Sequence, residues 1–351
     1  MATETHIRFS AVDGWGVVVL DRQGALNALT RPMMQAFSRQ LARWHTDPAI
    51  GGVVLKAAPG RAFCAGGDVV QVRDHVLSGD VEGALAFFRD EYLLDWRLGT
   101  YPKPVVALMN GITMGGGVGL SVHGPYRVMT ENVLFAMPET GIGFFPDVGA
   151  SHALPRLAGR LGRYLGMTGA RLKGGAAVAA GLGTHFVPAG RLGDCEAALL
   201  AAEPTEIEAT LDRFAADPPA DGLPPPDEVD ALFAGPDAAA IVAALEAADG
   251  PFARATLTEL RRKSPLSVAA VVPEIDRGAG LDLGDCLRRE YAMVRPFLLR
   301  GDFVEGVRAL LVDKDRTPRW RHGRIEDVTP DEAAAMLAGD EDPGLALHWD
   351  A

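Results

Sequence analysis

The chain has 351 residues, of which 48% are hydrophobic, and it carries a net charge of −12 with an isoelectric point near 5.2. This length can bury a sizeable core, and it fits one large domain or one domain with a C-terminal appendage. The acidic balance argues against nucleic acids and anionic membranes as partners, because both repel a negatively charged surface.

Cysteines and apolar stretches narrow the class of protein further. Cys64, Cys195 and Cys286 are scattered and form no C-x-x-C pair, so we expect neither a disulfide framework nor a metal site. Residues 1–10 include a glutamate and lack the apolar segment of a signal peptide. Residues 105–122 form the longest apolar stretch, but their glycines do not suit a membrane span. We therefore expect a soluble, cytoplasmic protein.

In chain order, the first predicted elements are a strand, a helix and a second strand. The β-branched runs at residues 16–20 (GVVVL) and 52–55 (GVVL) are bounded by turn residues, as buried strands are. Between them, Thr30 and Pro32 predict the start of a helix, and Asp47 with the following proline predicts its end. One face of that helix is apolar and carries Met33, Met34, Phe37, Leu41 and Trp44.

Further strands are predicted at residues 104–109 and 126–130, and residues 133–136 are a candidate to continue the same sheet. Because strands alternate with helices up to about residue 190, we expect an α/β core at residues 1–200. Residues 201–250 are rich in Pro, Ala and Asp. They predict a connecting segment with weak helices, for example residues 238–248 with Asp237 as their cap.

Residues 251–351 are expected to form a helical C-terminal region. Residues 283–300 have the pattern of a helix that is kinked or interrupted at Pro296. Asp302 and Glu305 have the spacing of a capping box at the start of another helix. The acidic tail from about Gly339 is expected to fray.

Two glycine-rich segments each follow a predicted strand and precede a predicted helix. In residues 61–68 (RAFCAGGD), Gly67 would present its N–H group at the mouth of the sheet. The alternative is a tight turn in which Asp68 caps a helix. In residues 110–120 (NGITMGGGVGL), the N–H group of Gly116 is a second donor for a negatively charged oxygen. The alternative is close packing of helix on sheet. The segment has neither the dinucleotide spacing nor a P-loop lysine.

Two carboxylates, Glu139 and Asp147, follow the glycine run in an apolar segment rich in Gly and Pro. Burial would raise their pKa values, and the repulsion between them would push those values apart. Such a pair opposite backbone donors suits acyl chemistry, because one part holds an oxyanion while the other attacks or moves protons. The alternatives are that Asp147 caps a helix over residues 148–157 and that Glu139 is solvated.

Glu91, Arg22 and two histidines are weaker candidates. Glu91, within FFRDEY, has the setting of an acid on a helix surface. Arg22 precedes residues 25–28 (ALNA) and could meet a phosphate, although a solvated arginine is the more common situation. His123 and His152 are near the carboxylates in sequence, but we assign them no catalytic role.

Together, these motifs resemble the crotonase (enoyl-CoA hydratase/isomerase) superfamily. The resemblance rests on the order and spacing of four segments: residues 25–28, residues 64–68 (CAGGD), residues 110–117 and residues 138–139 (PE). Within the superfamily, the chain is most similar to the 3-hydroxyisobutyryl-CoA hydrolases. That similarity is carried by residues 110–123 (NGITMGGGVGLSVH), 135–149 (FAMPETGIGFFPDVG), 263–265 and 302–320.

The resemblance implies a fold and a set of roles. The fold is a spiral of ββα units with a helical C-terminal region. Gly67 and Gly116 match the two oxyanion-hole donors, and Glu139 and Asp147 match catalytic carboxylates. Glu91 matches a glutamate that contacts the substrate, as Gly116, Glu139 and Asp147 also would. The CoA moiety is assigned to Arg22, Ala25 and Ala65, although Gln23 and Gly24 stand where many family members carry a basic residue.

The resemblance also points to one reaction over another. A hydratase uses two glutamates, and the first would stand at Gly119, which cannot transfer protons. We therefore expect hydrolysis of a short, branched 3-hydroxyacyl-CoA, as in valine catabolism. An enoyl-CoA isomerase or hydratase and a non-catalytic acyl-CoA binding protein are the alternatives. Met114, Phe144 and Phe145 are candidates to line the acyl pocket, although core packing explains them equally well.

The expected partners follow from the same resemblance. The substrate is an acyl-CoA, with CoA as part of the substrate and no separate metal or redox cofactor. We expect no nucleic acid or membrane partner. A homo-oligomer, either a trimer or a hexamer, is expected from the superfamily, although an extended C-terminal region could instead cover the site within one chain.

Overall fold

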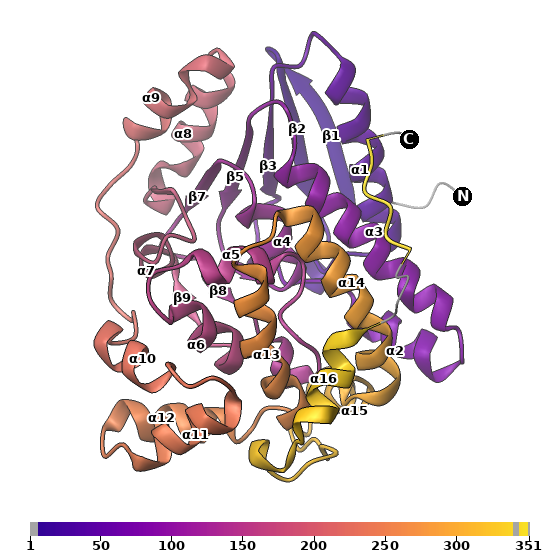
Figure 1. The fold of residues 1–351 in the computed structure, drawn as a ribbon. Helices are drawn as coiled ribbons and strands as arrows, with labels where there is room; N and C mark the ends of the chain where they lie inside the picture. The colour runs from indigo at the N-terminus through magenta and orange to yellow at the C-terminus, as the bar shows by residue number, and fades with distance from the viewer. Residues whose placement is uncertain (1–5, 340–343, 350–351) are drawn as a thin grey trace.

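The computed structural model describes residues 6–339 and 344–349. Its larger sheet has six strands in the order β1-β2-β3-β5-β7-β10 (Figure 1). β1 and β2 are antiparallel, and the other neighbouring strands are parallel. The strands are β1 (Ile7–Val12), β2 (Trp15–Leu20), β3 (Gly52–Ala57), β5 (Val105–Met109), β7 (Tyr126–Met129) and β10 (His185–Phe186). The expected strands in β2, β3, β5 and β7 are thus confirmed.

A second sheet of four short strands, in the order β4-β6-β8-β9, carries the loops of interest. These strands are β4 (Ala62–Cys64), β6 (Ile112–Met114), β8 (Leu134–Ala136) and β9 (Leu172–Lys173). The expectation that residues 133–136 continue the first sheet is wrong, because β8 pairs with β6 and β9 instead. The segments after β4, β6 and β8 therefore meet at one edge of the small sheet.

Helices cover both faces of the large sheet (Figure 1). One face packs on α8 and α9 through a small core that includes Val54, Val106 and Leu199, and the other packs on α1 and α3. The helices up to this point are α1 (Arg31–Thr46), α2 (Val69–Leu77), α3 (Val81–Gly99), α4 (Gly116–Val122), α5 (Ala150–Ala153), α6 (Leu161–Thr168), α7 (Gly174–Ala179), α8 (Ala189–Leu200) and α9 (Ile207–Asp212). The α/β class is confirmed.

Helix α1 forms as its sequence predicts. The Thr30 hydroxyl accepts a hydrogen bond from the N–H of Met33, Pro32 stands in the first turn, and Asp47 ends the helix. The five apolar side chains expected on one face are all buried. Burying such a stripe against the sheet is what makes a helix of this length stable.

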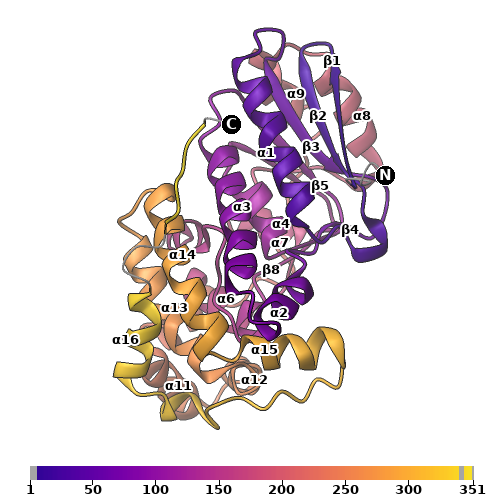
Figure 2. The same ribbon diagram turned by 90° about the vertical axis from the view of Figure 1, so that its right-hand side faces the viewer.

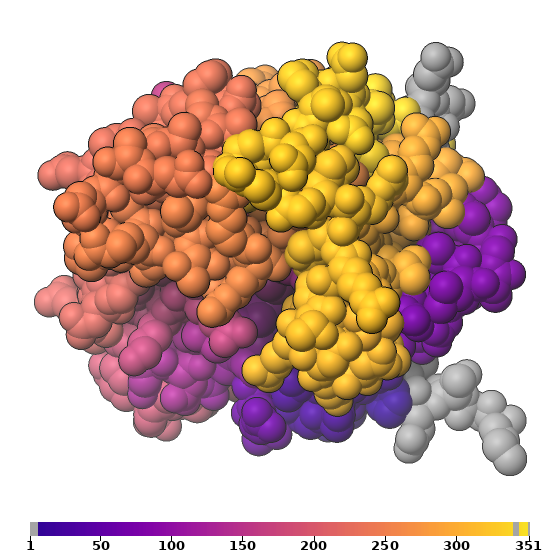
Figure 3. Space-filling view, turned by 90° about the horizontal axis from the view of Figure 1, so that it is seen from below, coloured from indigo at the N-terminus to yellow at the C-terminus, as the bar shows by residue number. Residues whose placement is uncertain are grey.

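The chain beyond α9 folds back under the core. Its helices are α10 (Pro226–Leu232), α11 (Ala238–Ala247), α12 (Pro251–Leu260), α13 (Pro265–Gly278), α14 (Leu283–Arg300), α15 (Phe303–Val307) and α16 (Pro330–Ala338). Seen from below, the orange and yellow surface of these helices forms much of that face (Figure 3). The Asp237 carboxylate caps α11 as expected, by accepting from the N–H of Ala240.

The helix expected at residues 283–300 is confirmed as α14, and it runs through Pro296 without interruption. The expected capping box at Asp302 is wrong. The Asp302 side chain forms no capping bond and instead accepts from the Ser264 hydroxyl at 2.6 Å and from the N–H of Arg321. Residues 340–343 and 350–351 of the acidic tail lie outside the described residues. The same holds for Glu4, the glutamate of the N-terminal segment that argued against a signal peptide. Among the described residues, no helix is long and apolar enough to cross a membrane.

Candidate active site

Two backbone N–H groups lie close together where the small sheet meets α4. Gly67 follows β4, and Gly116 is the first residue of α4. A Cβ placed on Gly116 would lie 3.3 Å from the nitrogen of Gly67, so the two backbones approach closely. Gly66 makes the turn with a φ of +111°, a conformation that favours glycine. The N–H groups of a first helical turn have no partner within the helix, so Gly116 can donate to a ligand oxygen.

Glu91 approaches these two glycines from α3. A Cβ on Gly116 would overlap its Oε1, and a Cβ on Gly67 would lie 3.3 Å from the same atom. This Oε1 is buried and has no hydrogen-bond partner among the described residues. The interpretation of Glu91 as a solvated surface acid is wrong, because α3 packs against α1, α4 and α14.

Glu139 approaches the same site from the loop after β8. It begins the 3-10 turn η2 (Glu139–Ile142), and its side chain is only 5% exposed. Its Oε1 lies 3.0 Å from the position of a Cβ on Gly115, directly before Gly116. Its Oε2 is buried and lacks a hydrogen-bond partner within the described part of the chain. The alternative of a solvated glutamate is therefore wrong.

Asp147 is buried beside Tyr92, the residue that follows Glu91 on α3. The hydroxyl of Tyr92 donates a 2.8 Å hydrogen bond to Oδ2 of Asp147. The helix-capping alternative is wrong, because α5 begins only at Ala150 and has Gly149 as its N-cap. The helix expected over residues 148–157 is a single α turn followed by a 3-10 turn, η3 (Leu154–Arg156).

Burial and mutual repulsion raise the pKa values of these acids. Burial raises the pKa of Asp147 to about 7, although the hydrogen bond from Tyr92 opposes the rise. Burial, followed by the negative charge of Asp147, raises the pKa values of Glu91 and Glu139 well above their usual range. The site therefore retains protons that exposed carboxyl groups would release, which suits proton transfer near neutral pH.

Sequence patterns did not single out Glu290, a fully buried acid of α14. Its carboxylate accepts hydrogen bonds from the N–H groups of Gly149 and Ser151 and from the Ser151 hydroxyl, at 2.7, 3.0 and 2.5 Å. It thereby holds the turn that follows Asp147. Burial raises its pKa to about 8. The sequence did contain a signal for its burial. Leu287, one turn before Glu290, and Val294, one turn after it, form a buried apolar stripe on the same face of α14.

Asp95 is a second buried acid that sequence patterns missed. It lies one helical turn after Glu91 on α3 and is 0% exposed. Both of its carboxyl oxygens lack a hydrogen-bond partner among the described residues. A Cβ on Gly119 would lie 2.8 Å from each of these oxygens and 2.7 Å from the Cβ of Val148. Gly119 therefore leaves the room that Asp95 occupies.

The residues expected to meet CoA lie beside the Gly67 turn. The N–H of Ala65 donates to the carbonyl of Leu26, the neighbour of Ala25, which joins the two segments. Arg22 forms an ion pair with Asp68 at 2.9 Å, so its guanidinium is not freely solvated. Asp68 uses its carboxylate for this pair and makes no capping hydrogen bond to α2, so the capping alternative is wrong.

Phe144 and Phe145 pack in an aromatic cluster. Phe144 stacks on Phe88 at a centroid distance of 5.2 Å, and Phe145 meets Phe297 at 4.8 Å. Both side chains are almost fully buried. Core packing thus accounts for both side chains.

The histidines near the carboxylates have structural contacts, and a possible metal group lies elsewhere. The Nε2 of His123 lies 2.7 Å from the carbonyl of Val148, and burial lowers the pKa of this histidine to about 4.

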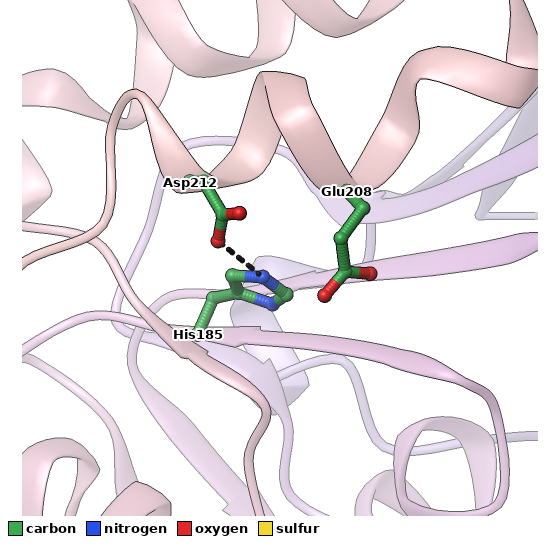
Figure 4. A group of neighbouring side chains, drawn as sticks. All are labelled: His185, Glu208 and Asp212. Carbon is green, nitrogen blue, oxygen red and sulfur yellow. Dashed lines mark ion pairs between the residues drawn. The ribbon is translucent and has the colours of Figure 1, made fainter.

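Among residues 6–339 and 344–349, one group of side chains is close enough to share a metal ion: His185 on β10 with Glu208 and Asp212 of α9 (Figure 4). No acid around Gly67 belongs to it.

A family model described as enoyl-CoA hydratase/isomerase matches residues 15–337. Among curated proteins, the 3-hydroxyisobutyryl-CoA hydrolase, mitochondrial, of Xenopus tropicalis is 43% identical over 90% of this chain and 84% of its own length. The 3-hydroxyisobutyryl-CoA hydrolase 1 of Arabidopsis thaliana is 40% identical over 93% of this chain and 90% of its own length.

Two solved structures share the whole fold. A structure described as an enoyl-CoA hydratase from Rhodobacter sphaeroides 2.4.1 is 40% identical, has a TM-score of 0.87, and covers 97% of this chain and 99% of its own. A structure described as a carnitinyl-CoA dehydratase from Mycobacterium thermoresistibile is 36% identical, with a TM-score of 0.91 and coverage of 98% and 99%.

Proposed function

The chain belongs to the enoyl-CoA hydratase/isomerase family, and we propose that it hydrolyses 3-hydroxyisobutyryl-CoA to 3-hydroxyisobutyrate and CoA. Relatives named for this activity align with most of its length at about 40% identity. The observation that supports the proposal is the close approach of the Gly67 and Gly116 backbones, with buried Glu139 beside the neighbouring Gly115. Asp147 is also buried, and its negative charge raises the pKa of Glu139.

In the proposed mechanism, the N–H groups of Gly67 and Gly116 donate to the thioester carbonyl oxygen. These donors stabilise the negative charge that develops when the carbonyl carbon is attacked. Glu139 either attacks that carbon to form a mixed anhydride, which water then hydrolyses, or removes a proton from the attacking water. In both routes the carbon–sulfur bond breaks, and the CoA sulfur leaves as a thiolate that takes up a proton.

Asp147 and Glu91 are proposed to orient the 3-hydroxyl of the acyl group and to assist proton movement. Asp147 has a pKa raised to about 7 by burial, so it can hold or release a proton near neutral pH. Trapping of a mixed anhydride on Glu139 would distinguish the two routes. Arg22, Ala25 and Ala65 are proposed to contact the CoA moiety, and the mechanism uses no metal or redox cofactor.

Release of thiol from 3-hydroxyisobutyryl-CoA tests this function directly. The three cysteines are buried, so a thiol reagent should report mainly on CoA. We expect Glu139→Gln to lower turnover by about 10²–10⁴-fold, because a positioned carboxylate contributes that much. Calorimetric binding of the substrate should persist in this variant. The matched control is Glu228→Gln, an exposed glutamate on α10, which should retain full activity.

A hydratase is the second candidate, because two solved structures with the same fold are described as a hydratase and a dehydratase. Hydration of crotonyl-CoA, measured as the loss of the enoyl absorbance, tests this candidate in parallel with the thiol assay. Gly119 argues against it, since Val148 and Asp95 fill the space that a side chain there would need. Loss of enoyl absorbance without thiol release would replace the hydrolase proposal with this one.

The remaining expectations are separate proposals. A role in valine catabolism predicts that deletion of the gene impairs growth on valine. A cytoplasmic location is a separate proposal that cell fractionation would test, because the animal relatives are named as mitochondrial proteins. A trimer or hexamer is proposed from the family, and sedimentation of the purified protein would distinguish these states from a monomer.

A further inference from the structure

The carboxyl group of Asp95 is an anomaly of packing. It is fully buried on α3, and neither of its oxygens has a hydrogen-bond partner among the described residues. Buried polar groups in native proteins nearly always have partners, and an unpaired one costs about 1–3 kcal/mol. The proposed mechanism does not use this group. Both oxygens of Asp95 therefore have hydrogen-bonding capacity that a ligand could use.

The position of Asp95 relative to the oxyanion donors defines where that ligand would meet it. Gly116 and Gly119 are three residues apart on α4 and therefore share one face of the helix. Glu91 presses on this face at Gly116, and Asp95, one turn further along α3, presses on it at Gly119. The carboxyl group of Asp95 thus lies about one helical turn, roughly 5 Å, further along α4 toward its C-terminus than the N–H group of Gly116. We call this displacement the depth of Asp95 in the site.

This depth matches the acyl chain of the proposed substrate. A thioester carbonyl held by Gly67 and Gly116 fixes the first carbon of the acyl group beside the start of α4. The 3-hydroxyl is attached two carbons further along, at the depth of the next turn. We propose that Asp95 is a specificity-determining residue that hydrogen-bonds the 3-hydroxyl of the acyl group. This inference rests on the proposed function, because it assigns the hydroxyl of that substrate.

The surroundings of Asp95 favour this role over that of a charged group. The acids that influence it are Glu91 on the same helix, Asp147 in the loop before α5, and Glu290 on α14. Burial, followed by repulsion from these acids, raises its pKa well above the usual range. A neutral carboxyl group can donate one hydrogen bond and accept another, and a hydroxyl group can do the same. The two groups therefore satisfy each other without any buried charge.

The expected consequence is discrimination against acyl groups that lack the hydroxyl. A site built to hydrogen-bond a hydroxyl can reject an analogue without it by as much as about 10⁴–10⁵-fold. Asp95 is one of several acids near the acyl group, so we expect its own share to be about 10–100-fold. The substrate pair that isolates this share is 3-hydroxyisobutyryl-CoA and isobutyryl-CoA, which differ only in the hydroxyl.

The test measures kcat/KM for both thioesters in the wild type, Asp95→Ala and Asp95→Asn. We expect Asp95→Ala to reduce the preference for the hydroxylated substrate by about 10–100-fold, mainly through slower reaction of that substrate. Asp95→Asn is the matched control, because its amide also donates and accepts, and it should keep the preference within a few fold. Thermal unfolding verifies that both variants fold, as removal of an unpaired buried acid should allow.

Two outcomes would overturn the inference. An equal loss on both substrates in Asp95→Ala would assign Asp95 a purely structural role, and an unchanged preference would mean that the hydroxyl lies elsewhere. If the wild type releases thiol from neither substrate, the proposed function fails instead. Calorimetry with dethia analogues of the two thioesters then decides on Asp95, because a preference for the hydroxylated analogue that Asp95→Ala abolishes would still support it.

Discussion

Asp147→Asn should make the folded protein more stable at neutral and alkaline pH while it lowers activity. Burial raises the pKa of this acid from 3.8 to about 7. Between these two values the folded chain holds a proton that the unfolded chain has released. Stability is therefore present at low pH and is lost as the pH rises from about 4 to about 7. Asparagine is neutral throughout this range, so the variant should not share the loss.

The size of the effect follows from the shift. Each pKa unit corresponds to about 1.4 kcal/mol, so a rise of about three units sets an upper bound of roughly 4 kcal/mol. Relaxation of the neighbouring acids reduces this figure, and we expect a gain of about 2–4 kcal/mol at pH 8. Near pH 4 the two proteins should be almost equally stable, because protonated aspartic acid and asparagine are similar in shape and the amide oxygen can still accept from Tyr92.

Thermal unfolding at a series of pH values from 4 to 8.5 provides the assay. One kcal/mol shifts Tm by roughly 2–4 °C in domains of 150–250 residues, so a gain of several degrees at pH 8 is expected. Asp221→Asn, at an exposed turn position, is the matched control and should run parallel to the wild type. The reasoning would be refuted if Asp147→Asn also ran parallel to the wild type at every pH. Thiol release measured beside it should show the loss of activity.

Two further substitutions test the geometry of the site. Gly116→Ala should lower kcat by about 10²–10³-fold, because its Cβ would overlap Oε1 of Glu91 and displace a proposed oxyanion donor. Thiol release measures this loss. Gly190→Ala is the control, because a Cβ at that position meets open space. Glu290→Ala should lower the free energy of unfolding by about 3 kcal/mol or more, because it leaves three buried donors of Gly149 and Ser151 without a partner; a Tm equal to that of the wild type would contradict this.

Local patterns predicted the elements whose signals are contained in adjacent residues. Helix α1 combines a cap, an early proline and an apolar stripe, and the structure contains all three. The glycine segments likewise predicted the turns at Gly67 and Gly116, because a strand that runs into glycines and then into a helix leaves few alternatives. The resemblance to a family singled out Glu139 and Asp147, and in the structure both acids are buried and have raised pKa values.

Contacts between distant residues explain what the sequence did not predict. Asp147 and Asp302 both stand at positions typical of helix caps, but each side chain bonds to a distant residue instead, Tyr92 for Asp147 and Ser264 for Asp302. Glu91 and Asp95 have the spacing of a polar helix stripe. Their burial depends on α14, which lies beside α3 in Figures 1 and 2 but is far away in sequence.

The C-terminal helices are therefore part of the site rather than an addition to it. Glu290 of α14 holds the turn after Asp147, and the hydroxyl of Tyr291 donates to the carbonyl of Leu85 on α3. These bonds connect α14 to the two elements that carry Asp147 and Glu91. Water excluded by α14 would otherwise solvate the acids and return their pKa values toward the usual range. It follows that loosening of α14 should impair proton transfer before it affects the proposed oxyanion donors, Gly67 and Gly116, which belong entirely to the α/β core.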